Sequence, residues 1–417
     1  MSTRYDCVII GGGLVGATTA VALARAGRSV ALVEAQNRPA AKRPQAGPSE
    51  PDPPVRLSHD DRTLVINAAS LNILSRLELL PDRAVRCPIE TIEVTRQGGF
   101  GRLTMHAPDY GRSEFGQVIV ARELGRVALS AVRQNDQITE FCPDRLEDWT
   151  LTPEGVQARL ESGAVIQTRL LIGADGNDSS VRQQAALPCD RHGYGQSAMI
   201  FNVLPQRPTR STAHERFTAR GPLALLPQPE GRVGVVWIDS DAAIDDAMDL
   251  DDQTLCRELG ERFGPAMGTF NTPGKRARYP LLRQRTPHPI AERVVVIGNA
   301  ANAVHPVSAQ GFNLGLRDVA GLVDAIGRHD DPGQPEALEA YAAVRRADQD
   351  ATVRYTDTLA RAFTNPSGLA RLATGLGIMA HAGLPGLRHR LVHAAMGFRA
   401  PLASLARPLN HQTGPEA

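Results

Sequence analysis

The hydrophobic pattern of this chain contains short apolar runs that are followed by glycine-rich turns. Residues 6–10 form a β-type apolar run. The stretch that follows, GGGLVGATTAVALARAG, is typical of a glycine-rich turn opening a helix with small, apolar faces. The next run, SVALVEA, has the pattern of a buried strand that ends near Glu34. A strand, a helix and a second strand within about 30 residues predict a βαβ unit.

The rest of the chain divides into β-rich and helical patterns. Alternating apolar and polar positions predict antiparallel strands over residues 89–120 and a second β-rich region over residues 195–240. Residues 251–264 have helical periodicity, and the chain after about residue 333 looks helical. Residues 36–54 are rich in proline and polar side chains, so we expect a surface loop there.

The composition argues against several classes of protein. With 417 residues, of which 42% are apolar, the chain can bury a large core and form two or three domains. Its net charge of +1 gives no reason to expect a nucleic-acid partner. The five cysteines are scattered and form no Cys-x-x-Cys pair, which fits a reducing cytoplasm and argues against disulfides or a metal site. The sequence predicts no signal peptide, and it lacks the run of about 18 apolar residues that a membrane span needs.

The turn after the first strand carries a GxGxxG motif formed by Gly11, Gly13 and Gly16. In this context the first glycine allows a tight turn, the second lets the backbone approach a pyrophosphate, and the third lets helix and strand pack closely. The helix N-terminus adds a partial positive charge that favours phosphate. Glu34 can accept hydrogen bonds from a ribose and disfavours a 2′-phosphate. The motif therefore predicts a site for an unphosphorylated adenosine ribose, as in NAD or FAD.

A second motif, LLIGADGNDSSVR, places Asp175 at the mouth of a buried strand. One interpretation is a functional carboxylate beside a helix start that Ser179 or Ser180 caps. The other is an Asp-Gly turn, which is common in proteins without any binding role. The sequence alone leaves both interpretations open.

A third motif lies in the stretch VVVIGNAANAVHPVSAQGFNLGLRD, between a buried strand and a helix. Connections of this kind usually need about 2 to 6 residues. This one is longer and consists largely of small residues, so we expect its backbone to lie against a ligand.

In this order, the three motifs resemble those of the flavoprotein monooxygenases that act on aromatic rings and have a single dinucleotide-binding domain. The resemblance implies that FAD is the cofactor and that the third motif follows its ribityl chain and isoalloxazine ring. The helix from residue 313 onward would direct its positive end at the flavin pyrimidine edge. The residues that this places at the cofactor are Gly298, Asn299, Pro306, Gly311 and Asn313, together with Asp175 of the second motif.

Two positions depart from the pattern of that family. An aspartate of the family is Asn299 here, and a family glycine is Ala309. Asn299 can still hydrogen-bond a ribityl hydroxyl, but it brings no charge. Ala309 restricts the backbone if its position needs a positive φ.

Within this group, the chain is most similar to the FAD-dependent monooxygenases of ubiquinone biosynthesis. The phrases ERFTARGPLALLPQPEGRVGVVW and GKRARYPL carry that similarity, which extends from residue 4 to about residue 405. It implies hydroxylation of a polyprenylated methoxyphenol with O2 through a C4a-hydroperoxyflavin, and NAD(P)H or another electron donor. Arg62 and Arg122 fall where this family keeps arginines near the flavin and its phosphates.

The resemblance implies no certain catalytic side chain, because the flavin is the reactive group. His305 is the one candidate, since it would sit beside the flavin edge and could assist proton movement. The alternative is that His305 only shapes its loop.

The resemblance also implies an α/β fold, α+β overall, like that of the p-hydroxybenzoate-hydroxylase-like flavoproteins. Three chain segments, residues 1–88, 112–185 and 286–332, would form a GxGxxG-type FAD-binding domain. Residues 89–111 and 186–285 would form a substrate-binding domain with a mixed or antiparallel sheet. Residues 333–417 would form a helical C-terminal region.

The prenylated substrate dissolves in a bilayer, so we expect a cytoplasmic enzyme with peripheral contact to the inner membrane. Residues 367–383 have apolar side chains at helical spacing, which suits either an interfacial surface or a helix packed on its own domain. Other ubiquinone-biosynthesis proteins are further expected partners. Two rival functions stay open: a sister hydroxylase of another ring position or another phenol, and a non-catalytic scaffold of a quinone-biosynthesis assembly.

Overall fold

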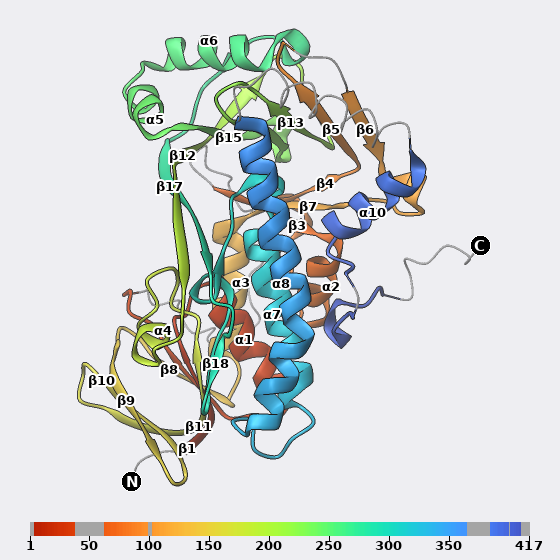
Figure 1. Cartoon of the computed structure of the whole chain (residues 1–417). Helices are drawn as coiled ribbons and strands as arrows, with labels where there is room; N and C mark the ends of the chain where they lie inside the picture. Colours follow the sequence, from red (N-terminus) through yellow and green to blue (C-terminus); the bar gives the residue numbers. More distant parts are fainter. Residues whose placement is uncertain (1–3, 38–61, 99–101, 365–383, 400, 410–417) are drawn as a thin grey trace, which may run out of the picture.

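Three β-sheets and a set of long helices make up the fold (Figure 1). The structure is a computed structural model that describes residues 4–37, 62–98, 102–364, 384–399 and 401–409. The α-helices are α1 (Leu14–Arg25), α2 (Ala68–Arg76), α3 (Ala121–Arg133), α4 (Ser180–Gln184), α5 (Asp241–Met248), α6 (Asp252–Phe263), α7 (Gly311–Ile326), α8 (Pro335–Thr364) and α10 (Pro385–Ala395). Short 3₁₀ turns lie at Arg83–Val85, Ala107–Tyr110, Pro229–Gly231, Pro265–Met267, Gly298–Ala300, Val307–Ala309 and Ser404–Ala406.

The first sheet is largely parallel and buried. Its order is β18 (Ile290–Ala291), β19 (Val294–Val296), β11 (Val165–Gly173), β1 (Arg4–Ile10), β2 (Val30–Val33) and β8 (Ile138–Phe141), with β10 (Gly155–Leu160) and β9 (Leu146–Thr152) as an antiparallel extension from β11. Strand β1 lies in its middle, and Cys7, Val8 and Ile9 are fully buried there. A parallel sheet is covered on both faces, which is why its central strands are continuous apolar runs.

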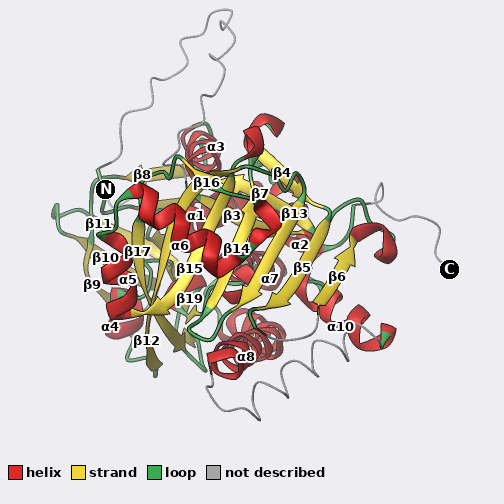
Figure 2. Ribbon diagram, turned by 90° about the horizontal axis from the view of Figure 1, so that it is seen from above, coloured by secondary structure: helices red, strands yellow, loops and turns green. Residues whose placement is uncertain are grey.

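The second sheet is antiparallel except for one parallel pair, so it is mixed. Its order is β20 (Asn302–Ala303), β17 (Ala277–Arg285), β12 (Asp190–Pro205), β15 (Val233–Ser240), β14 (Pro222–Pro227), β13 (Thr212–Phe217), β5 (Thr91–Arg96) and β6 (Arg102–His106), with β16 (Phe270–Asn271) beside β12. The parallel pair is β13 with β5. One face packs against α5 and α6 around the buried Trp237. Seen from above, the strands from β12 to β6 lie side by side (Figure 2).

A small third sheet joins the two larger ones. It consists of β3 (Thr63–Asn67), β7 (Gly116–Val120) and β4 (Arg86–Ile89). Helices α7 and α8 run together along the molecule, from the end that holds β11 toward the end that holds β13 (Figure 1). The expected α/β architecture with a mixed second sheet and C-terminal helices is confirmed.

Most of the elements expected from periodicity form where predicted. The helix expected over residues 251–264 is α6, and the loop of the third motif leads into α7. The predicted surface loop at residues 36–54 and the apolar stretch at residues 367–383 lie almost entirely outside the described residues. In the described part of the chain, no helix is long and apolar enough to cross a bilayer.

Candidate functional site

The parallel sheet brings the three sequence motifs together. Ile10, Gly173 and Val296 end adjacent strands and occupy matching register positions in β1, β11 and β19. The carboxyl ends of parallel strands meet at one edge of a sheet, and ligands bind in the crevice outside that edge. The loops that follow these three residues carry the GxGxxG motif, Asp175 and the long third loop, so the motifs share one edge although they lie far apart in sequence.

The glycines of the first motif have three different environments. Gly11 has φ +98°, a left-handed conformation that turns the chain, and a Cβ there would lie 2.5 Å from the Ala174 carbonyl oxygen. A Cβ on Gly16 would lie 1.8 Å from the Gly11 carbonyl oxygen, so helix and strand touch there. Gly13 is different, because a Cβ would meet no atom within 4 Å and the residue lines a cavity. Its backbone is therefore the part of the motif that a ligand can approach.

The Glu34 carboxylate lies at this glycine turn. The Gly12 amide donates to Glu34 Oε2 over 2.8 Å, and the Gln36 amide donates to Oε1 over 2.7 Å. These bonds fix the carboxylate beside the N-terminus of α1, which begins at Leu14. A carboxylate and the open N-terminus of a helix therefore lie side by side at this turn.

Asp175 uses one carboxylate oxygen to hold the chain, and its other oxygen has no partner among the described residues. Its Oδ2 accepts hydrogen bonds from the Ser180 amide (2.7 Å), the Ser180 hydroxyl (3.0 Å) and the Val181 amide (3.3 Å). Ser179 caps α4 by accepting from the Arg182 amide. Asp175 Oδ1 is buried and has no hydrogen-bond partner among the described residues. The Asp-Gly turn is therefore real, and it also supplies a free acceptor, so the two interpretations of this motif are compatible.

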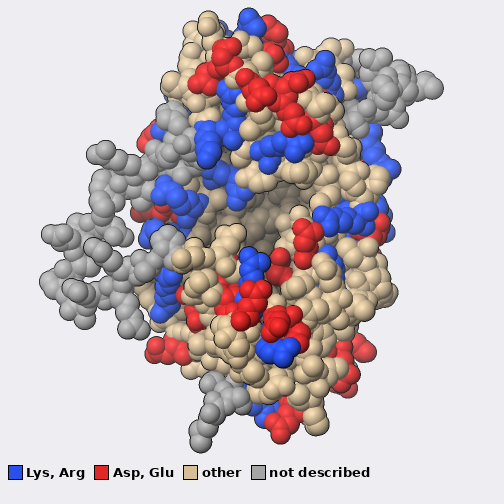
Figure 3. All heavy atoms as spheres, turned by 90° about the vertical axis from the view of Figure 1, so that its left-hand side faces the viewer, with Lys and Arg blue, Asp and Glu red and all other residues tan. Residues whose placement is uncertain are grey.

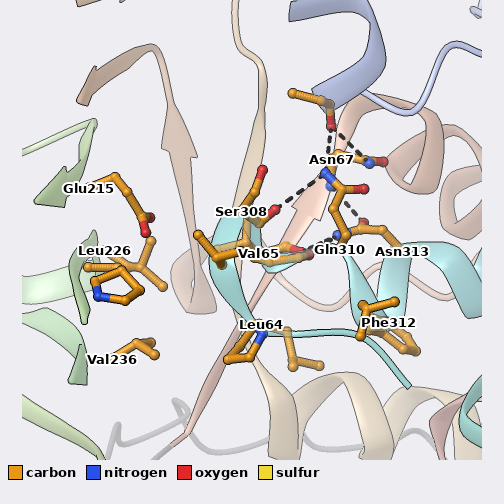
Figure 4. A pocket seen from close by; sticks show the side chains of 18 of the residues that line it. Leu64, Val65, Asn67, Glu215, Leu226, Val236, Ser308, Gln310, Phe312 and Asn313 are labelled. Carbon is orange, nitrogen blue, oxygen red and sulfur yellow. Dashed lines mark hydrogen bonds between the residues drawn. The ribbon is translucent and has the colours of Figure 1, made fainter. Parts of the chain in front are cut away.

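The third loop is anchored at both ends. Gly298 has φ +59°, and its amide donates to the buried Asp318 carboxylate on α7. At the other end, the Asn313 side chain donates to the carbonyls of Val65 and Ala309, each over 2.8 Å, and accepts from the Asn67 amide over 2.9 Å (Figure 4). These hydrogen bonds fix both ends of the loop. Asn299, which lies within it, is exposed and lines the cavity.

Ser308 and Ala309 have left-handed backbones, with φ of +65° and +48°. For residues other than glycine, this conformation costs about 1–2 kcal/mol each. The position where the family has a glycine therefore does need a positive φ here, and alanine adopts it under strain.

Two substitutions at Ala309 test this strain. Ala309→Gly removes the steric cost and should leave the free energy of unfolding within about 1 kcal/mol of the parent, because glycine also loses more chain entropy on folding. Ala309→Val places a β-branched side chain at φ +48° and should lower the free energy of unfolding by about 1–3 kcal/mol. Urea denaturation of both variants measures the difference. Equal stability of the glycine and valine variants would contradict a strained loop.

A large cavity of about 960 Å³ lies against all three motifs. Figure 3 shows a hollow in one face of the molecule, with charged side chains around its mouth and mostly uncharged atoms inside. The cavity begins at Gly13, Gly176 and Asn299 and extends past α7 to the second sheet. Its far part is apolar and lies between strands β5 and β6 and helix α10; the side chains there include Ile92, Leu103, Met105, Phe217, Leu391 and Met396.

Arg62 and Arg122, the two arginines that the family resemblance placed near the flavin, lie in different parts of the structure. Arg62 lines the cavity, where it donates to the Tyr279 hydroxyl over 2.8 Å and lies over the Tyr279 ring. Arg122 lies in the first turn of α3 and forms an ion pair with Glu123 (3.0 Å); it is not among the residues that line the cavity.

His305 lies behind the cavity wall, whereas its neighbour Pro306 lines it. The His305 ring is 1% exposed and packs edge-on against Tyr194, with 5.1 Å between ring centroids. Its Nδ1 accepts from the Val307 amide (3.2 Å), and burial lowers the pKa of His305 to about 4. The imidazole is therefore neutral near pH 7. This arrangement suits a residue that shapes the loop better than one that carries protons at the cavity.

Three residues of the site were not identified from the sequence. Glu215 on β13 is the one acidic residue among the described residues that line the cavity, and Tyr355 on α8 lines it as well. Asn67 caps α2 and ties β3 to Asn313. The sequence does contain a signal for Glu215. Side chains alternate along a strand, so Ala213, Glu215 and Phe217 lie on the same face, and Glu215 places a carboxyl group among apolar side chains there.

The residues present fit FAD. Gly13 leaves open backbone at the helix N-terminus, Glu34 lies beside it, and Asp175 has a buried acceptor that no described residue contacts. A dinucleotide needs these three features, namely a place for phosphates, an acceptor for a ribose and an acceptor for a further hydroxyl. The long third loop offers backbone and small side chains along the same cavity.

Comparisons with known protein families agree with this geometry. A family described as FAD binding domain matches residues 104–356, which is more than half of the chain. A family described as FAD dependent oxidoreductase matches residues 6–47, where the GxGxxG motif lies.

Two characterised relatives align over nearly the whole chain. The chain is 32% identical over 399 residues to the ubiquinone hydroxylase UbiL of Rhodospirillum rubrum, covering 94% of this chain and 89% of that protein. It is 29% identical to the 3-demethoxyubiquinol 3-hydroxylase of Escherichia coli, covering 94% of this chain and 98% of that protein.

Solved structures share the fold at lower identity. PqsL, a probable FAD-dependent monooxygenase from Pseudomonas aeruginosa, matches with a TM-score of 0.73 and 21% identity, over 90% of this chain and 100% of that one. The p-nitrophenol 4-monooxygenase PnpA of Pseudomonas putida matches with a TM-score of 0.74 and 17% identity, over 96% of this chain and 100% of that one.

Proposed function

This chain belongs to the FAD-dependent monooxygenase family of ubiquinone biosynthesis, and from that membership we propose that it hydroxylates the ring of a polyprenylated methoxyphenol. The flavin-dependent monooxygenase class and the FAD cofactor predicted from the three motifs are confirmed. The substrate, the ring position and the role of each residue below are our proposal.

The observation that carries the proposal is the shape of the cavity. One continuous space of about 960 Å³ passes from the nucleotide edge of the parallel sheet into an apolar part beside β5, β6 and α10. A free phenol would need only a small pocket. A long apolar extension next to the flavin site suits a substrate with a hydrocarbon tail, since each buried methylene contributes about 0.8 kcal/mol.

FAD, when bound, supplies the oxygen-transfer chemistry, and the chain supplies position and exclusion of water. We propose that Gly13 and the N-terminus of α1 bind the pyrophosphate, and that Glu34 binds the adenosine ribose. A hydroxyl of the cofactor would donate a hydrogen bond to Asp175 Oδ1, which no described residue contacts. The complete proposed set is Gly11, Gly13, Gly16, Glu34, Arg62, Arg122, Asp175, Gly298, Asn299, Pro306, Gly311 and Asn313, several of which shape the site rather than touch the cofactor.

We also propose that NAD(P)H or another donor reduces the flavin, because the sequence has no second GxGxxG motif that would hold a resident nicotinamide. The apolar substrate would reach the cavity through peripheral contact with the inner membrane. Val392 on helix α10 and Met396 at its end are buried in the core, so these two side chains are not available for that contact.

Mass spectrometry of quinone-pathway lipids from cells lacking this protein tests the proposal. Accumulation of one polyprenyl methoxyphenol, restored to normal by the parent gene, is the expected result and also gives the tail length. Normal quinone levels would exclude a role in this pathway. Accumulation at an early step shared by many enzymes would instead favour the non-catalytic scaffold, which flavin loading and substrate-dependent oxygen uptake of the purified protein would then check.

A sister hydroxylase of another ring position is the second candidate. It is favoured by the similarity to the 3-demethoxyubiquinol 3-hydroxylase of Escherichia coli, at 29% identity. The same lipid profile separates the two, because the accumulating intermediate lacks the hydroxyl that this enzyme adds.

A further inference from the structure

Glu215 is a carboxyl group in an apolar wall of the cavity. It lies on β13 between Ala213 and Phe217, which face the same side of the strand and belong to the buried cluster around β5 and β6. Its direct neighbours on the two adjacent strands are Ala224 and Val94, so neither strand offers it a partner. A charged residue in a sheet is usually opposite a residue of complementary charge, whereas both residues opposite Glu215 are apolar.

The Glu215 carboxylate points into the cavity toward the third loop. Figure 4 shows its oxygens directed from β13 toward Ser308, with Leu226 and Val236 on the same wall. Among the described residues, Glu215 forms no hydrogen bond and no ion pair. A half-buried carboxylate without a partner is costly, unless a ligand supplies the missing donor.

A second polar pair faces the same space. Tyr355 on α8 lies near Ser308, and both residues line the cavity. Burial and, to a smaller extent, the charge of Glu215 raise the pKa of Tyr355, which indicates that the two side chains lie near each other. The cavity therefore presents one carboxylate and one Tyr–Ser hydroxyl pair in walls that are otherwise mostly apolar.

We propose that the Glu215 carboxylate binds the phenolic hydroxyl of the substrate and accepts its proton, so that the ring reacts as the phenolate. This rests on the proposed function, because it needs a phenol in this cavity. The O–H bond of the phenol breaks, its electron pair stays on oxygen and delocalises into the ring, and the proton moves to a Glu215 oxygen. No group is oxidised or reduced in this step, and the ring becomes a stronger nucleophile.

The environment of Glu215 suits this role. Desolvation by burial raises the pKa of Glu215 to about 7, whereas an exposed phenol has a pKa of about 10. A general base works best when its pKa lies near the operating pH. Tyr355 on α8 lies near Glu215, and Arg62 and Tyr279 also line the cavity. His214, which lies along the same cavity, has its ring against Phe263, and Arg216 alternates to the other face of β13. Activity should therefore rise as the pH increases through about 7, because only the ionised carboxylate accepts a proton.

The test compares the FAD-loaded parent with Glu215→Gln, which preserves size but cannot accept the proton. The probes are a 2-methoxyphenol with a short prenyl chain and its O-methyl ether, which has no ionisable hydroxyl. The ratio of the two affinities shows whether Glu215 binds the phenolic hydroxyl. We expect the parent to bind the phenol more tightly than the ether above pH 7, where the carboxylate is ionised, and Glu215→Gln to lose most of that preference while both proteins bind the ether equally. Glu215→Asp should recover part of the preference.

Turnover gives a second readout. General-base catalysis usually contributes a factor of about 10²–10⁴, so kcat with the phenol should fall at least about 100-fold in Glu215→Gln and lose its rise near pH 7. Glu93→Gln is the matched control, because Glu93 lies on the adjacent strand β5 and does not line the cavity. It should behave like the parent.

The outcomes separate this proposal from the function on which it rests. A parental preference for the phenol over the ether in Glu215→Gln, with parental turnover, would overturn the role of Glu215 and leave the hydroxylase function intact. If the parent neither binds the phenol nor consumes oxygen in its presence, both proposals fail together.

Discussion

Replacing Asp318 by asparagine should lower the free energy of unfolding by about 3–5 kcal/mol, the usual effect of leaving a buried charge without its partner. Asp318 is fully buried on α7. It accepts hydrogen bonds from Arg345 Nε and Gln349 Nε2 on α8, each over 2.9 Å, and from the Gly298 amide. The substitution removes one of the negative charges that neutralise Arg345, and it weakens the hydrogen bond that holds Gly298 at the start of the third loop.

Asp318 belongs to a balanced set of two acids and two bases between α7 and α8. Arg345 Nη1 and Arg317 Nε both contact Asp348 Oδ2 over 2.8 Å, and all four side chains are at least nine-tenths buried. Arg345→Met should lower the free energy of unfolding by about as much as Asp318→Asn, because it leaves the Asp318 carboxylate without its charged partner. The double variant should cost clearly less than the sum of the two, because removing both charges restores the balance.

Urea denaturation of the four proteins of this cycle measures the coupling. Asp252→Asn is the control, because Asp252 pairs with Arg276 but is largely exposed, and exposed pairs contribute about 1 kcal/mol or less. Additive effects in the cycle, or a control as damaging as Asp318→Asn, would show that the buried network is not what joins the two helices.

The same network predicts sensitivity to acid. Burial alone would raise the pKa of Asp348, but Arg317 and Arg345 outweigh it and lower the pKa to about 2. An unfolded aspartate titrates near 3.9, so the stabilisation is complete above that pH and is lost as the pH falls through about 2. Asp348 should contribute about 2 kcal/mol to this loss, which stability curves measured between pH 5 and pH 2 would detect.

Gly16→Ala should prevent normal folding or reduce the free energy of unfolding by about 3 kcal/mol or more. The added Cβ would lie 1.8 Å from the Gly11 carbonyl oxygen, a distance that no real contact tolerates. Helix α1 would have to move away from β1, and the core around Ala17 and Ala20 would open.

Gly13→Ala is the matched control, three residues earlier in the same motif. Its Cβ would meet no protein atom within 4 Å, and its φ of −58° suits alanine. The fold should therefore be unchanged within about 0.5 kcal/mol. The methyl group would enter the cavity where we place the pyrophosphate, so FAD binding should weaken by about 1–3 kcal/mol. Thermal unfolding and the flavin content of the purified proteins separate the two effects, and unchanged FAD affinity in Gly13→Ala would move the pyrophosphate elsewhere.

Local geometry explains why much of the site could be predicted. A tight turn, a close helix approach and an open backbone each depend on a few neighbouring residues, so the spacing of Gly11, Gly13 and Gly16 was informative. The need for a positive φ at Ala309 could be suspected from the missing glycine alone. Glu215 and Tyr355 could not be found in this way, because neither has a motif and only the packing of α8 and β13 around one cavity brings them near each other.

The sequence by itself determined the βαβ unit and the glycine turn, because these follow from short-range periodicity and from turns that only small residues can form, and the resemblance of its three motifs gave the family and the α/β architecture. The tertiary structure decided which side chains share one space. It aligned the ends of β1, β11 and β19, buried His305 behind the wall and turned Glu215 into the cavity. These outcomes depend on strand register and helix packing between residues more than 100 positions apart, which no local pattern encodes.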